Sequence, residues 1–130
     1  MPRVSFDEML TRADVITLHC PLTDETRGLV DASVIDRLPD DALVVNVGRG
    51  ELVDQRALAT ALADGRLGGA GLDVLSSEPP PADNPLLDAP HCFITPHLAW
   101  ATRAARQRLI DELAANLKAF LAGESRNRVD

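Results

Sequence analysis

Runs of apolar residues bounded by proline, glycine or acidic residues divide the chain into alternating strands and helices. Four runs are apolar along most of their length and predict buried strands: residues 14–20 (DVITLHC), 42–47 (ALVVNV), 69–74 (GAGLDV) and 92–95 (CFIT). Within these runs, apolar residues do not alternate with polar ones, whereas they would in a strand with one solvent-exposed face. We therefore expect an α/β fold with a parallel sheet and helices on both faces.

Helices are predicted where a capping residue precedes apolar residues at helical spacing. The four capping residues are Ser5, Asp31, Asp54 and Thr102. The helices that follow them are expected to end near residues 12, 38, 65 and 123, and the last is the longest. The acidic, proline-rich segment 76–90 is expected to form a surface loop.

Composition narrows the class of protein. With 130 residues, 45% of them hydrophobic and 25% charged, the chain has the balance of one soluble globular domain. A formal net charge of −7 argues against nucleic acid and anionic membrane surfaces as partners. Cys20 and Cys92 lack the spacing of metal ligands, so we expect reduced, buried thiols in a cytoplasmic protein.

Residues suited to a binding site follow each predicted strand. In parallel sheets, ligands bind outside the carboxyl ends of the strands. The residues at these ends are His19, Cys20 and Pro21, then Asn46 to Gly50, then Asp73, then Thr95 to His97. The alternative is that these polar residues merely begin ordinary surface loops.

Four side chains are candidates for chemistry, each with a structural alternative. Arg49, between Gly48 and Gly50, can present a planar fork to a carboxylate, or can be a surface arginine in a tight turn. His97 can serve as a general acid near neutral pH, or be structural. Glu78 can be a solvated loop carboxylate. Asp73 interrupts an apolar strand, and a buried carboxylate needs a partner.

Four segments together resemble a known family. Residues 18–23 (LHCPLT), 45–50 (VNVGRG), 71–79 (GLDVLSSEP) and 95–102 (TPHLAWAT) are similar in order and spacing to consecutive signatures of the D-isomer-specific 2-hydroxyacid dehydrogenases. The resemblance extends over residues 5–123 and is strongest to the glycerate dehydrogenase and hydroxypyruvate reductase branch. It implies the second half of a Rossmann-type domain: residues 1–123 as a partial NAD(P)-binding domain and 124–130 as a polar tail.

The resemblance also implies roles for individual residues. Arg49 would bind the substrate carboxylate, His97 would be the general acid or base, and Glu78 would orient His97. Asp73 would hold the nicotinamide carboxamide. A carboxylate at Glu78, where formate dehydrogenases of this superfamily carry glutamine, points to a small 2-keto or 2-hydroxy acid such as glyoxylate or hydroxypyruvate. The positions implied to line the cofactor, NAD or NADP, are Cys20, Pro21, Thr26, Val47, Gly48, Arg49, Asp73, His97 and Ala99.

The chain departs widely from the family pattern: G-x-G-x-x-G, the fingerprint that binds the pyrophosphate, does not occur in it, and the strand that would distinguish NAD from NADP is not found either. Three interpretations therefore stay open. The chain represents part of a dehydrogenase, a non-catalytic binding module that needs a partner chain, or a remnant that folds poorly. We expect the isolated chain to be inactive and to form an oligomer or associate with a complementary half.

Overall fold

The computed structural model describes residues 3–129. Residues 1, 2 and 130, which belong to the predicted domain and tail, lie outside this range. The chain divides into two compact units, residues up to His97 and residues from Leu98 onward, and each is treated by itself.

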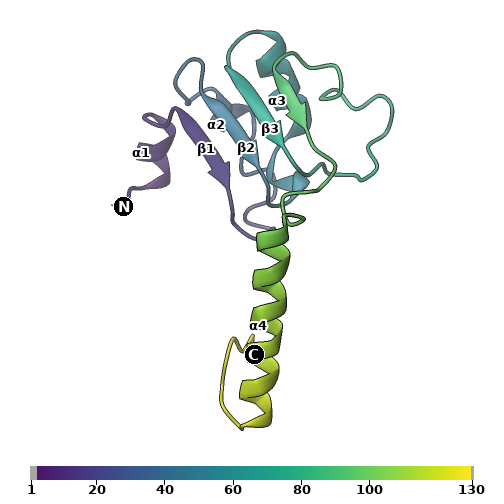
Figure 1. Ribbon diagram of the computed structural model, residues 1–130. Coiled ribbons are helices and arrows are strands. Elements are labelled where there is room, and N and C mark those ends of the chain that lie inside the picture. Colours follow the sequence, from purple (N-terminus) through teal and green to yellow (C-terminus); the bar gives the residue numbers. More distant parts are fainter. Residues whose placement is uncertain (1–2, 130) are drawn as a thin grey trace. The chain divides into compact units, whose positions relative to one another are not determined.

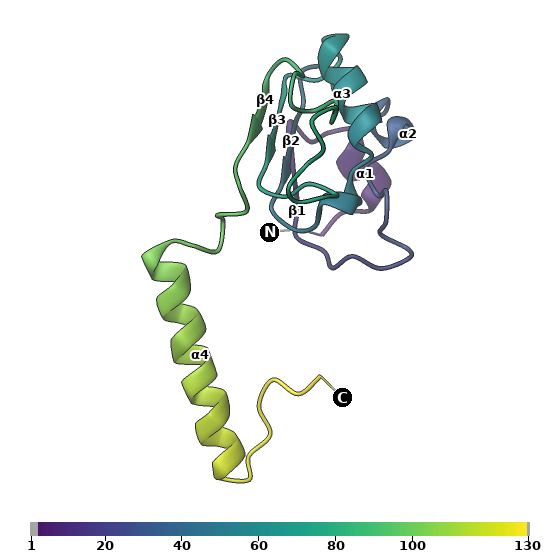
Figure 2. The ribbon, with the colours of Figure 1, turned by 90° about the vertical axis from the view of Figure 1, so that its right-hand side faces the viewer.

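The first unit is built on a four-stranded parallel sheet (Figures 1 and 2). Its strands are β1 (Val15–Leu18), β2 (Leu43–Asn46), β3 (Gly69–Leu72) and β4 (Cys92–Ile94), and they lie side by side in this order. The last residues of the four strands are aligned by the register, Leu18 with Asn46, Asn46 with Leu72, and Leu72 with Ile94. All four carboxyl ends therefore meet at one edge, and the predicted parallel sheet is confirmed.

The helices of the first unit begin at the predicted capping residues. They are α1 (Phe6–Leu10), α2 (Ala32–Ile35) and α3 (Gln55–Ala63), with a short 3₁₀ helix, η1 (Gly50–Leu52), that the sequence did not indicate. The side chains of Ser5, Asp31 and Asp54 accept hydrogen bonds from the amides of Glu8 (3.1 Å), Val34 (2.9 Å) and Ala57 (3.1 Å) respectively. Each bond satisfies an amide that the helix itself leaves unpaired.

The core lies between the sheet and its helices. Ile16, Val44 and Leu72 of the strands and Leu58 and Leu62 of α3 are all buried and belong to one hydrophobic cluster. Figure 2 shows α1, α2 and α3 on the same face of the sheet. The predicted cover on both faces is thus not found within residues 3–97.

The strand order explains this one-sided cover. The chain crosses the sheet in one direction from β1 to β4, and connections between parallel strands are right-handed as a rule. Helices in such connections all fall on one side. On the other side Val15, Leu43 and Phe93 are exposed in this unit, Phe93 by 77%.

The second unit contains the longest helix, α4 (Arg103–Leu121). Its predicted cap is confirmed, because the Thr102 hydroxyl accepts a hydrogen bond from the amide of Ala105 at 3.1 Å. The predicted apolar stripe is exposed in this unit: Leu109, Ile110, Leu113, Leu117 and Phe120. Across the described residues, α4 included, no helix is both long and apolar enough to span a membrane.

Candidate active site

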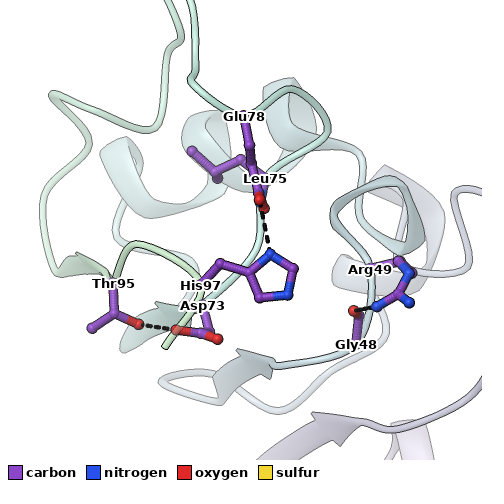
Figure 3. Close-up of polar contacts among 7 residues, drawn as sticks. All are labelled: Gly48, Arg49, Asp73, Leu75, Glu78, Thr95 and His97. Atoms are coloured by element: carbon purple, nitrogen blue, oxygen red, sulfur yellow. Dashed lines mark hydrogen bonds and ion pairs between the residues drawn. The ribbon is translucent and has the colours of Figure 1, made fainter. Parts of the chain in front are cut away.

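The loops at the carboxyl edge of the sheet carry all four candidate side chains (Figure 3). Arg49 lies in the turn after β2, Asp73 directly follows β3, Glu78 lies in the loop after β3, and His97 follows β4. The strands are parallel and aligned at their ends, so residues far apart in sequence come to one edge of one sheet. The first unit contains this arrangement complete, because it ends at His97.

Glu78 and His97 form a hydrogen-bonded pair, as predicted. Glu78 Oε2 lies 2.8 Å from His97 Nδ1, and Glu78 Oε1 accepts a hydrogen bond from the amide of Leu75 at 3.0 Å. The hydrogen bond with His97, and then that with the Leu75 amide, lower the pKa of Glu78 below its ordinary value. Both oxygens of the Glu78 carboxylate are thereby held in hydrogen bonds, and Oε2 fixes the orientation of the His97 imidazole.

The backbone conformation at His97 helps to orient its imidazole ring. His97 has a φ of 54°, in the left-handed region, and its amide donates to the carbonyl oxygens of Asp73 at 3.0 Å and Thr95 at 2.9 Å. Since Nδ1 is occupied by Glu78, Nε2 points away from that carboxylate (Figure 3). The side chain is 46% exposed, so Nε2 is available for proton exchange with a ligand.

Asp73 is buried, with 6% of its surface exposed, and it has the partner that its burial requires. The Thr95 hydroxyl donates to Asp73 Oδ1 at 2.5 Å, and the Asp73 amide donates to the Asn46 carbonyl oxygen at 2.9 Å. A cavity of about 350 Å³ opens at this point, within the size range of small-molecule sites. It is lined by Asp73, Leu75, Glu78, Pro79, Pro80, Ile94, Thr95, Pro96 and His97.

The turn that carries Arg49 is held by Asn46, which the sequence placed at the end of a strand but to which no individual role was assigned. The side chain of Asn46, only 1% exposed, donates to the Arg49 carbonyl oxygen at 2.8 Å and accepts from the Gly48 amide at 3.0 Å. The exposed guanidinium of Arg49 donates from Nη1 to the Gly48 carbonyl oxygen at 2.8 Å. Asn46 interrupts an apolar run as Asp73 does, and the same argument applied to it would have found it.

The loop after β1 forms a separate cluster. The Thr26 hydroxyl donates to the Pro21 carbonyl oxygen at 2.7 Å and accepts from the Thr23 amide at 2.8 Å, which closes the loop on itself. Cys20 lines a second cavity, of about 240 Å³, between β1 and α1. Among the described residues that line the cavity beside His97, none comes from this loop.

Two further predicted positions, Val47 and Ala99, belong to different units of the chain. Val47 is exposed next to Gly48, at the end of β2. Ala99 belongs to the second unit.

Cys20 and Cys92 are free thiols, as expected, but both are half-buried rather than buried. Burial still raises the pKa of the Cys92 thiol.

Comparison with known proteins identifies the family. The family model described as "D-isomer specific 2-hydroxyacid dehydrogenase, NAD binding domain" matches residues 1–99. The chain belongs to this family. The resemblance noted in the sequence is thereby confirmed, and the match covers every candidate side chain at the sheet edge.

Individual relatives are similar over nearly the whole chain. A glycerate dehydrogenase from Methylorubrum extorquens is 46% identical over 129 residues, which cover 98% of this chain and 41% of the relative. A hydroxypyruvate reductase from Blautia hydrogenotrophica is 46% identical over 127 residues, 98% of this chain and 39% of the relative. This chain therefore spans about two fifths of the length of these relatives.

Solved structures share the fold. An NAD-dependent formate dehydrogenase from Staphylococcus aureus, crystallised in complex with NAD, is 38% identical and has a TM-score of 0.77. The similar part covers 95% of this chain and 38% of that enzyme. The Rossmann-type architecture expected from the sequence is thus confirmed.

Proposed function

We propose that this chain carries the catalytic side of a dehydrogenase that interconverts a small 2-keto acid and the corresponding 2-hydroxy acid, of the glyoxylate or hydroxypyruvate type. The carrying observation is the 2.8 Å pair between Glu78 and His97, at the same sheet edge as Asp73 and Arg49. Such a pair suits proton transfer to or from a carbonyl oxygen. The names of the two relatives at 46% identity support the same substrate class.

The four side chains have complementary tasks in this proposal. The guanidinium of Arg49 binds the substrate carboxylate as a planar fork. As the 2-keto carbon is reduced, negative charge develops on its oxygen, where Arg49 and a protonated His97 stabilise it. His97 then gives its Nε2 proton to that oxygen, and in the oxidation direction it takes the proton back. Glu78 keeps the ring in the required orientation throughout.

The residues present fit the nicotinamide end of NAD or NADP. When bound, the nicotinamide supplies or accepts the hydride. Asp73 lines the cavity beside His97 and offers carboxylate oxygens as acceptors for a carboxamide N–H. G-x-G-x-x-G does not occur in this chain, so we propose that residues outside it bind the pyrophosphate. The two free thiols support a cytoplasmic location.

We further propose that the rest of such a dehydrogenase covers β1 and the face of the sheet on which residues 3–97 place no helix. Two observations support this: among residues 3–129, β1 pairs with β2 alone, and the side chains of Val15, Leu43 and Phe93 are exposed. An apolar edge strand with unpaired backbone groups favours association with another chain. In isolation, this chain would therefore associate with a second copy.

A chimera tests the activity. This chain replaces the matched 129 residues of the glycerate dehydrogenase from Methylorubrum extorquens. We expect the chimera to reduce hydroxypyruvate or glyoxylate, which the decrease in NADH or NADPH absorbance measures. His97→Ala should lower kcat by about 10²–10⁴-fold with little change in the KM for the cofactor. His19→Ala is the matched control, because the imidazole of His19 bonds the hydroxyl of Thr17 and takes no part in the Glu78–His97 pair.

Two outcomes would contradict these proposals. A chimera that folds and binds NADH but reduces no 2-keto acid would refute the activity. An isolated chain that light scattering finds monomeric and that turns over substrate unaided would refute the proposed association.

A further inference from the structure

The turn that carries Arg49 and the loop that carries Glu78 meet through their backbones at Gly50. A Cβ atom placed on Gly50 would lie 2.0 Å from the carbonyl carbon of Leu75, 2.2 Å from its oxygen and 2.3 Å from the nitrogen of Ser76. Gly50 does not have a left-handed φ, so its conformation alone does not demand glycine. The close approach of the second loop demands it.

This contact joins two sets of hydrogen bonds. On one side, Asn46 bonds both the Gly48 amide and the Arg49 carbonyl oxygen and fixes the turn that leads into Gly50. On the other side, the Leu75 amide bonds Glu78, whose second oxygen bonds His97. Gly50 and Leu75 are both buried, so the contact between them is tightly packed. A displacement of either loop would therefore be transmitted to the other.

We propose that Gly50 is a positioning residue. Because Gly50 has no side chain, its backbone contacts that of Leu75 and Ser76, and this contact fixes the position of Arg49 relative to the Glu78–His97 pair. The inference rests on the proposed function for its catalytic consequence, but the contact itself can be tested without activity. If a methyl group separates the loops, Glu78 loses its aligned donors and Arg49 shifts relative to His97. A misplacement of about 1 Å at a reacting centre can cost 10²-fold in rate.

The first test measures the pKa of Glu78 in the 130-residue chain by ¹³C NMR of its carboxyl carbon. In Gly50→Ala we expect the pKa of Glu78 to rise toward its ordinary value, because the bonds with His97 and Leu75 that lower it are disturbed. The matched control is Gly71→Ala, where a Cβ would meet only the Cγ2 of Val45 at 3.9 Å. A folded Gly50→Ala chain with an unchanged Glu78 pKa would overturn the proposal.

A second variant decides the matter if Gly50→Ala does not fold. Glu78 is 40% exposed, so Glu78→Ala leaves the core intact while it removes the acceptor of the Leu75 amide. We expect the amide NMR signals of both Leu75 and Gly50 to move, whereas that of Gly71 stays. A perturbation that stops at Leu75 would show that the two loops are not coupled.

The third test separates positioning from simple substrate binding in the chimera described above. Gly50→Ala should raise the KM for the 2-keto acid and also lower kcat by about 10²-fold, with the KM for NADH little changed. A rise in the KM for the 2-keto acid alone would mean that Gly50 serves only the arginine turn, and would overturn the proposal. If the unsubstituted chimera is inactive, the proposed function fails, while the two NMR tests still decide the role of Gly50.

Discussion

The hydrogen bond from Thr95 to buried Asp73 should make a measurable contribution to stability. In Thr95→Val the hydroxyl is replaced by a methyl group of similar size, so shape is kept and the 2.5 Å bond is lost. Because 94% of Asp73 is shielded from solvent (6% exposed), water replaces the lost donor poorly. Removing the donor of a buried hydrogen-bond acceptor lowers the free energy of unfolding by about 1–3 kcal/mol, and we expect a loss in this range.

Urea unfolding, followed by circular dichroism at one fixed protein concentration, measures this loss. With a slope of about 1–3 kcal/mol per molar urea for small proteins, the unfolding midpoint of Thr95→Val should fall by about 1 M. Thr95→Ser is the matched control: it keeps the hydroxyl and removes one methyl group, which even when fully buried is worth only about 0.8 kcal/mol. Equal midpoints for the two variants would refute the reasoning.

Two further predictions concern ionisation. The pKa of Glu78 should rise in His97→Ala and stay unchanged in His19→Ala, as read by ¹³C NMR, because the bond with His97 is the largest cause of its depression. Because folding lowers the pKa of Glu78, its ionised carboxylate stabilises the fold at pH values above the ordinary pKa of a glutamate. This stabilisation is lost as the pH falls through the lowered pKa of the folded chain. The loss of stability at low pH should be smaller in His97→Ala. Burial raises the pKa of Cys92, so its alkylation by iodoacetamide at a fixed mildly alkaline pH should be slower in the folded chain than in urea; equal rates would contradict this.

Local features of the fold were predictable from the sequence. The caps at Ser5, Asp31, Asp54 and Thr102 are confirmed because an N-cap depends on residues two or three positions away. The bonding of Glu78 with His97 was also predictable, through the resemblance of the segments that contain them. The catalytic and cofactor roles assigned to individual residues stay predictions.

Features that depend on tertiary approach were not predictable. The contact of Gly50 with Leu75 arises only when two loops distant from each other in the sequence meet at the sheet edge. Thr95 belongs to one of the four family-like segments, but its hydrogen bond to Asp73 was not predicted. That bond follows from the pairing of β3 with β4. The one-sided placement of α1, α2 and α3 was not predicted, because an apolar run indicates burial on both sides without saying which elements supply the cover.

The left-handed backbone at His97 changes how substitutions at that position should be interpreted. Left-handed φ values cost most L-residues roughly 1 kcal/mol, much less for glycine and asparagine, and most for β-branched residues. Part of any defect in a valine or isoleucine variant would then be backbone strain rather than a missing imidazole. Asparagine and glycine tolerate this conformation, so at position 97 they report the lost chemistry with the least admixture of strain.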